Sequence, residues 1–244
     1  MSRVWLIARR EWREQSRQPV MLAVIGGTFA LILSLCALGL WASLRLDPED
    51  VGLDTLSVAV GVVNLANWLL FTQLMGIVAV LAGHAMLHDR LSGVLPFLLL
   101  APVRRWELLA GKVLGALGLV LAMYFAVCGV GFVGLAWVAD GRVAPERLPP
   151  SAGWAVTFFI AGPGWTALLA VVCALVSSLA RDVRTAQQVV WGVVLTTSLG
   201  GATLLAAAVT QPLWVQALVA ATGWLCVVVA IAAGQEVISR DLGR

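Results

Sequence analysis

Two histidines and an aspartate in this sequence have a spacing that could bind a metal ion. His84 and His88 are four residues apart, which places them on one face of a helix, and Asp89 follows directly. The zinc-protease motif H-E-x-x-H needs a glutamate at position 85, where this sequence has Ala85, so the general base of such an enzyme is absent. We interpret both histidines as interfacial side chains, and a bound metal or heme is the alternative.

The remaining reactive residue types form no catalytic motif. Four cysteines lie singly in apolar stretches, without the CxxC spacing of a zinc site or the framework of a disulfide-rich domain: Cys36, Cys128, Cys173 and Cys226. Gly111-Lys112 is followed by Val113 and lacks the upstream glycine of a phosphate-binding P-loop. The sequence therefore predicts neither enzymatic activity nor a cofactor, and it predicts that any energy from ATP comes from a partner.

The composition indicates which kind of element must position these residues. Hydrophobic residues make up 61% of the 244 residues and charged residues only 12%, whereas soluble domains have about 45–50% and about 25%. The apolar stretches between the charges are long enough to cross a bilayer, which takes about 20 residues. The sequence predicts an all-α integral membrane protein with six transmembrane helices in a domain spanning residues 20–238. We expect the helices at residues 20–44, 56–87, 113–139, 154–180, 187–209 and 213–236, with a turn at Gln211-Pro212 between the last two.

The basic residues predict the orientation of these helices. Thirteen of the 16 lysines and arginines lie in the N-terminal segment, in the loops near residues 88–112 and 181–184, and in the tail at residues 239–244. Short loops rich in lysine and arginine stay on the cytoplasmic side during insertion. Both termini are therefore expected in the cytoplasm, with the chain in the cell membrane. Because the charges flank membrane spans, we expect no nucleic-acid partner.

Residues 1–19 have the pattern of an amphipathic helix at a membrane surface. At 100° per residue, four arginines gather on one side: Arg9, Arg10, Arg13 and Arg17. Apolar residues fall on the other side, and they are Val4, Trp5, Ala8 and Trp12. This pattern predicts an interfacial helix in contact with membrane lipid. The alternative is that the arginines act only as the signal for orientation.

Residues 88–112 form the expected cytoplasmic loop between the second and third spans. This loop is longer than a simple connector, and its charged and apolar residues follow a regular pattern. Asp89 and Arg90 precede a short apolar segment that ends at Pro102, and Arg104 and Arg105 open the next helix. This pattern predicts a short helix along the cytoplasmic face. Its apolar side must be covered by lipid or by another protein.

Polar residues are rare inside the spans. Asn64, Asn67 and Gln73 in the second span are expected either to bind neighbouring helices by hydrogen bonds or to line a substrate path. Ionisable groups are almost absent there, so an ion-coupled carrier is not supported. Small residues in the third span predict close helix packing, and they are Gly111, Gly115, Gly118, Gly129, Gly131 and Gly134.

The order of these motifs resembles the membrane subunits of ABC transporters of the type-2 exporter class. The central loop matches that family's pattern at Asp89, Arg90, Gly93, Leu98, Leu99, Pro102, Val103, Arg104, Glu107, Gly111 and Lys112. The segment from Arg9 to Glu14 is similar to the surface helix of the family, and Ser177-Ser178-Leu179 with Arg184 is similar to its connection between spans four and five. The resemblance covers the whole chain, but many relatives have an acidic residue where this chain has Pro96.

The resemblance implies a permease that pairs with a second permease, identical or related, and with two copies of a cytoplasmic ATPase subunit. The loop would form a coupling helix that contacts the ATPase. The residues expected to take part in this coupling are Asp89, Arg90, Gly93, Pro102, Arg104, Arg105, Glu107 and Lys112.

The function predicted on this basis is export of a hydrophobic or amphipathic substrate through an uncharged membrane interior. One alternative is the heme-handling permease of cytochrome c maturation, for which His84 and His88 would matter. Another is a non-transporting membrane scaffold that anchors a cytoplasmic partner.

Overall fold

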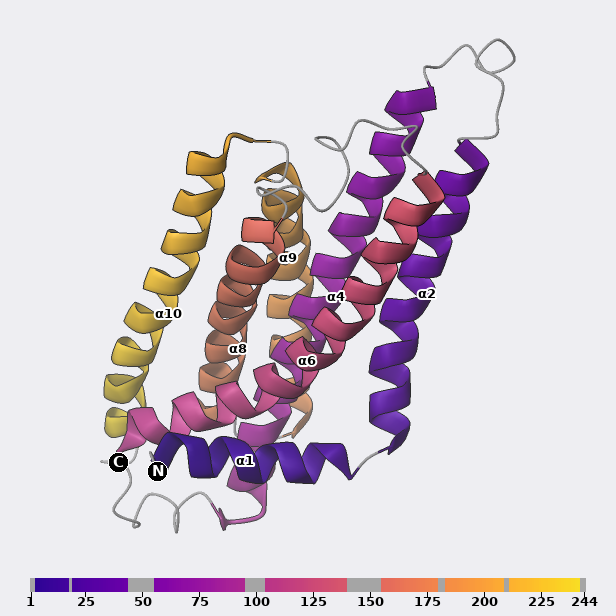
Figure 1. The fold of residues 1–244 in the computed structure, drawn as a ribbon. Coiled ribbons are helices and arrows are strands. Elements are labelled where there is room, and N and C mark those ends of the chain that lie inside the picture. The colour runs from indigo at the N-terminus through magenta and orange to yellow at the C-terminus, as the bar shows by residue number, and fades with distance from the viewer. Residues whose placement is uncertain are drawn as a thin grey trace.

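The computed structural model describes residues 3–17, 19–43, 55–94, 104–139, 155–179, 183–208 and 211–241. These residues form helices and contain no strand. In chain order the helices are α1 (Arg3–Ser16), α2 (Pro19–Ser43), α4 (Thr55–Leu91), α6 (Arg105–Ala139), the π-helix η1 (Thr157–Ala161), α8 (Gly162–Leu179), α9 (Val183–Ala208) and α10 (Leu213–Asp241) (Figure 1). Within the described ranges, six helical segments are long and apolar enough to cross a membrane. The prediction of an all-α protein with six membrane spans is confirmed.

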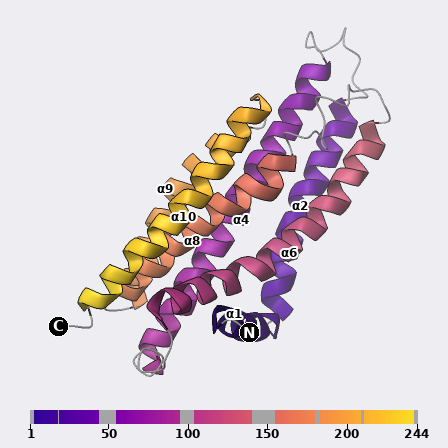
Figure 2. The same cartoon turned by 60° about the vertical axis from the view of Figure 1, so that its left-hand side comes forward.

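The spanning helices form a bundle with α4 at its centre. α4 packs against α2, α6, α8 and α9, while α10 packs mainly on α8 (Figure 2). The apolar runs of α2 and α10 are the least buried of the six, at 22% each, and that of α8 with η1 is the most buried, at 61%. The outer helices therefore present apolar faces that are typical of contact with lipid.

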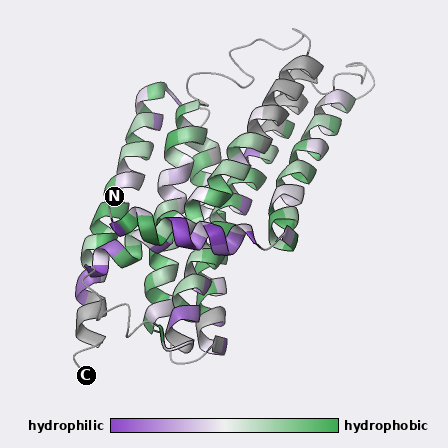
Figure 3. Cartoon of the chain, turned by 60° about the horizontal axis from the view of Figure 1, so that its bottom comes forward, coloured by the Kyte–Doolittle hydropathy of each residue, from purple (hydrophilic) through white to green (hydrophobic). Residues whose placement is uncertain are grey.

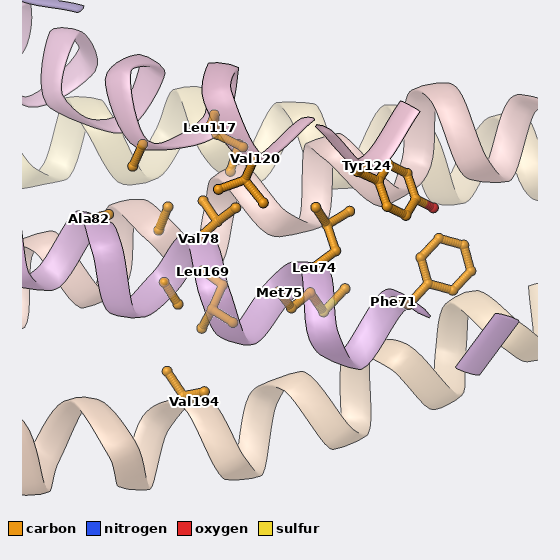
Figure 4. Close-up of a cluster of buried hydrophobic side chains, with 14 of the residues drawn as sticks. Phe71, Leu74, Met75, Val78, Ala82, Leu117, Val120, Tyr124, Leu169 and Val194 are labelled. Carbon is orange, nitrogen blue, oxygen red and sulfur yellow. The ribbon is translucent and has the colours of Figure 1, made fainter. Parts of the chain in front are cut away.

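Aromatic side chains from four elements meet in the core of the bundle. Tyr124 of α6 stacks on Phe158 of η1 with ring centroids 5.9 Å apart, and it meets Phe29 of α2 edge-on at 5.6 Å. Phe71 of α4 lies 4.7 Å from Phe158. Figure 4 shows Tyr124 and Phe71 side by side at one end of a row of buried aliphatic side chains that includes Val78. These contacts fix α2, α4, α6 and η1 relative to one another.

The contact between α8 and α10 uses paired tryptophans and glycines. The Trp165 indole N–H donates to the Val219 carbonyl oxygen at 3.1 Å, and the Trp224 indole N–H donates to the Ile160 carbonyl oxygen at 3.1 Å. Each indole ring packs against a glycine of the opposite helix. A methyl group added at Gly164 would lie 3.0 Å from Trp224, and one added at Gly223 would lie 3.0 Å from Trp165. Two indole donors that would be unpaired in lipid are thereby satisfied.

The π-helix η1 has a local cause in the sequence. Pro163 has no amide hydrogen and cannot donate to the carbonyl four residues earlier in an α-helix. The helix widens just before this residue, and the Gly162 amide donates to the carbonyl of Thr157, five residues earlier. The wider turn includes Ile160, whose carbonyl accepts the Trp224 hydrogen bond.

The structure shows where the connection between the second and third spans begins and ends. α4 continues to Leu91, and Gly93 has φ = +71°, a conformation that ends helices and favours glycine. α6 begins at Arg105, ahead of the expected start at residue 113. The expected coupling helix, with Pro96 and Pro102, lies outside the described residues. α9 ends at Ala208 and α10 begins at Leu213, so Gln211 and Pro212, where a turn is expected, lie between the two helices.

Among the described helices, α1 does not run with the bundle. It lies across one end, where α4 and α8 end and α6 and α9 begin, and this end is called the α1 end from here on (Figure 1). Seen from this end, a hydrophilic stretch of α1 crosses in front of largely hydrophobic spans (Figure 3). α1 packs chiefly against α6.

Candidate functional site

Glycines of α6 form the surface on which α1 lies. A methyl group added at Gly111 would lie 2.7 Å from Cβ of Ile7, and one added at Gly115 would lie 2.5 Å from Cβ of Glu11. At Gly118 it would overlap the indole of Trp12. The predicted close packing is confirmed for these three glycines, and their partner is α1.

The packing prediction is wrong for Gly129 of the same helix, because a methyl group there would meet no atom within 4 Å. The close contact with α1 is thus confined to the beginning of α6. The surroundings of Gly131 and Gly134 are not among those described.

A buried cluster of three charged side chains joins α1, α4 and α6. Nζ of Lys112 on α6 lies 2.6 Å from Oδ2 of Asp89 on α4 and 2.8 Å from Oε1 of Glu11 on α1. The same ammonium donates to the Ala85 carbonyl oxygen at 3.2 Å. The Lys112 side chain is 2% exposed. We call Glu11, Asp89 and Lys112 the Lys112 cluster.

All hydrogen-bond donors of the Lys112 ammonium have acceptors. A lysine ammonium has three N–H donors, and the three acceptors just described account for all of them. A buried charge without such partners would cost several kcal/mol. The ammonium is therefore stable in this position only when α1, α4 and α6 keep their mutual arrangement.

The start of α6 is fixed by its own first turn. The Glu107 carboxylate accepts a hydrogen bond from the Arg104 backbone N–H at 2.8 Å, and the Arg104 carbonyl accepts from the amides of Glu107 and Leu108. This is half of a capping box, in which a glutamate at the third helical position satisfies the amide before the helix. Arg104 is exposed and Arg105 is half-buried at this end of α6.

The structure brings only some of the predicted coupling residues together. Asp89 and Lys112 are in contact, whereas Glu107 and Gly93 shape the helix ends on either side of the loop. Arg90 belongs to α4, but its side chain is not described, and Pro102 lies outside the described residues.

Glu11 is the member of the cluster that was not predicted as a site residue. The sequence pattern that could have indicated it is the position of Glu11 three residues after Ala8, which places an acidic side chain on the apolar face of α1. The structure buries this face, with Ala8 at 1% and Glu11 at 8% exposed.

The outer face of α1 carries the predicted arginines. All four are exposed, and together with Leu6 and Glu14 they line a groove of about 300 Å³: Arg9, Arg10, Arg13 and Arg17. Nε of Arg10 donates to Oε1 of Glu14 at 2.9 Å, which raises the pKa of Arg10 above its ordinary value. Trp5 and Trp12 meet edge-on at 5.4 Å, and the Trp12 indole donates to the Leu114 carbonyl oxygen at 3.3 Å.

The polar residues of α4 have different surroundings. Nε2 of Gln73 donates to the Thr28 hydroxyl of α2 at 3.1 Å, which joins two spans. Asn67 is 1% exposed, and its amide finds no hydrogen-bond partner among the described residues. Asn64, one turn earlier, is half-buried.

The two histidines lie on α4 near the α1 end, and both are exposed. His84 borders a small pocket of about 70 Å³ whose lining includes Ser177 and Trp191. In the described part of the chain, no group of three or more His, Cys, Asp or Glu side chains is arranged to hold a metal ion.

A known protein family matches the sequence over nearly all of these helices. The family model described as "ABC-2 family transporter protein" matches residues 5–220, from α1 into α10. No curated protein matches the chain.

Proposed function

Because the chain belongs to the ABC-2 family of transporter proteins, we propose that it is the permease subunit of an ATP-binding-cassette exporter driven by a separate cytoplasmic ATPase. As a multi-pass membrane protein of this family, it is a component of membrane transport. The family generally works with a cytoplasmic ATP-binding subunit. The proposal is that this subunit docks at the α1 end.

The Lys112 cluster is the observation that carries the coupling role. The connection between the second and third spans leaves α4 at Leu91, two residues after Asp89, and enters α6 at Arg105, two turns before Lys112, so the two side chains lie on either side of it. A force applied to this connection acts on both helices. Separating one partner would leave an uncompensated buried charge, at a cost of about 3–5 kcal/mol. The cluster therefore favours movement of α1, α4 and α6 as one unit.

The arginines at this end support docking on the cytoplasmic side. Arg104 is exposed where α6 begins, and Arg105 is half-buried beside it. Basic residues are retained in the cytoplasm during insertion, so the α1 end and both termini are proposed to lie there. Arg104 and Arg105 are proposed to contact acidic groups of the ATPase, while Glu107 and Gly93 hold the helix ends that present the loop.

The polar residues of α4 are assigned separate roles. Gln73 is assigned to helix packing, because its amide is bonded to Thr28. Asn67 is assigned to the substrate path with Asn64, because a buried amide without a partner costs about 1–3 kcal/mol and is retained where a ligand can use it. The buried core around them is mainly apolar, with a few hydroxyl and amide side chains such as Thr157, Thr166 and Gln216, which suits a hydrophobic or amphipathic substrate.

The assembly proposed for this permease has two permease subunits, identical or related, and two ATPase subunits. The exposed apolar faces of α2 and α10 leave area both for a second permease and for lipid. The histidine pair gives no specific support to the heme-handling alternative, since both side chains are exposed and no third ligand joins them in the described chain.

The direct test is gentle detergent purification from the native host, followed by mass spectrometry of the proteins retained in stoichiometric amount. The proposal expects a P-loop ATPase at one copy per permease. A chain that purifies without any nucleotide-binding partner would favour a scaffold. If an ATPase is retained, ATP-dependent movement of substrate in vesicles separates a transporter from a scaffold, which would bind the partner without moving anything.

A further inference from the structure

The groove on the outer face of α1 is rich in arginines that have no part in the proposed coupling to the ATPase. Four of its six lining residues are arginines, and with Glu14 they give it a formal charge of +3. Glu14 is engaged by Arg10 at 2.9 Å. The remaining arginines make no ion pair with any residue that the structure describes, and they are Arg9, Arg13 and Arg17.

The spacing of the arginines suits a single anion between them. Arg9 and Arg13 are one turn apart on α1, and Arg17 follows four residues later in the turn after Ser16, so that all three line the same groove. The guanidinium group offers a planar fork of N–H donors that matches the oxygens of a phosphate. A groove of about 300 Å³ between such donors is suited to a phosphate group.

The apolar part of the same surface indicates where this phosphate comes from. Leu6 lines the groove and is 52% exposed. A free anion would gain nothing from this apolar side chain, whereas a phospholipid has acyl chains next to its phosphate. The first span begins at Pro19, three residues after α1 ends at Ser16, which keeps this surface near the level of the headgroups.

We propose that this groove is a binding site for the phosphate of an anionic phospholipid, with Arg9, Arg13 and Arg17 as its ligands and Leu6 against the acyl region. The lipid would hold α1 from its outer face, while Glu11 holds it from the inner face. The proposal rests on the position of α1 beside the membrane spans and is independent of the ATPase coupling.

The test uses the full-length chain in mild detergent, titrated with phosphatidylglycerol and monitored by native mass spectrometry, with phosphatidylcholine as the reference lipid. The expected result is selective binding of phosphatidylglycerol. Its affinity should fall roughly fivefold for each of Arg9→Gln and Arg13→Gln, because each basic residue near an anionic membrane surface contributes about this factor. Arg184→Gln is the matched control, since this arginine is also exposed at the α1 end but lies on α9. It should leave the affinity unchanged.

Three outcomes would overturn the proposal. Equal phosphatidylglycerol affinity in the wild type and in the Arg9→Gln/Arg13→Gln double variant would remove the site. Displacement of the lipid by inorganic phosphate at equal concentration would assign the groove to a free anion. Loss of a co-purifying ATPase in the double variant, with lipid affinity unchanged, would assign the surface to a protein partner. Size-exclusion elution at the wild-type volume checks that each variant is folded.

Discussion

At the scale of single residues, the α1 end depends on one buried lysine that serves three helices. Lys112 and Glu11 are 101 residues apart in the sequence, and no pattern within either segment indicates that they meet. The lysine lies next to Gly111, whose missing side chain lets α1 approach closely enough for Glu11 to reach it. The ion pair and the glycine contact therefore form one structural feature.

Replacing the central cation tests this feature. Lys112→Met would leave the carboxylates of Glu11 and Asp89 buried without their counter-ion, so we expect a loss of about 3–5 kcal/mol in the free energy of unfolding. Glu11→Gln keeps an oxygen acceptor and the Asp89 pair, and should cost about 1–2 kcal/mol. Equilibrium unfolding in mixed micelles measures both. Equal costs for the two variants would mean that Lys112 is not the centre of the cluster.

The unpaired amide of Asn67 leads to the opposite expectation for stability. Asn67→Leu removes a buried polar group that has no partner in the described structure, so the free energy of unfolding should rise by about 1–3 kcal/mol. Transport should fall in the same variant if this residue lines the substrate path. Gln73→Leu is the contrast, because it breaks the bond to Thr28 and should destabilise the protein. A destabilised Asn67→Leu would indicate a partner for the amide and would remove it from the path.

The sequence supplied part of the candidate site and missed the rest for a physical reason. Asp89 and Lys112 were predicted from a motif within one loop, and the structure brings them together. Glu11 was not assigned, because its importance arises from a helix packing that a linear pattern does not encode. Glu107 was predicted as a coupling residue, and the structure adds a local function for it as the cap of α6.

At the scale of elements, the membrane spans were predictable because each is an uninterrupted apolar run. The ends of these helices depend on individual hydrogen bonds, which hydropathy does not show. α6 starts at Arg105 because Glu107 caps it, and α8 is preceded by a π-helix because Pro163 cannot donate a hydrogen bond. The arginine side of α1 was also predictable from its period, but the apolar side proved to be covered by α6.

The packing of α1 on α6 can be tested with glycines of the same helix. Gly115→Val would push against Glu11 and displace α1, at a cost of about 1–3 kcal/mol for overpacking. Amide hydrogen exchange of residues 3–16 should rise in this variant. Gly129→Ala is the matched control, because it meets open space and should stabilise α6 by about 0.5–1 kcal/mol. Unchanged exchange in the Gly115→Val variant would show that α1 does not depend on this contact.

At the scale of the whole molecule, the bundle has a tightly packed centre at α4 and a specialised end. The described chain concentrates its buried charges at the α1 end, where α1, α4 and α6 meet. Under the proposed function, the force from a separate ATPase would enter at this end, because the described spans contain almost no charged group of their own. The order of the helices was predictable from the sequence, whereas their mutual packing required the structure.

Docking of a cytoplasmic ATPase at the α1 end can be tested by charge reversal followed by co-purification. Arg104→Glu with Arg105→Glu should lower the amount of retained ATPase by at least about tenfold, equivalent to about 1.4 kcal/mol, while membrane insertion is unchanged. Arg9→Glu with Arg13→Glu is the control, because it reverses the same number of charges on the outer face of α1. We expect selective loss of the ATPase in the first variant, and equal retention in both variants and the wild type would show that the ATPase does not dock through Arg104 and Arg105.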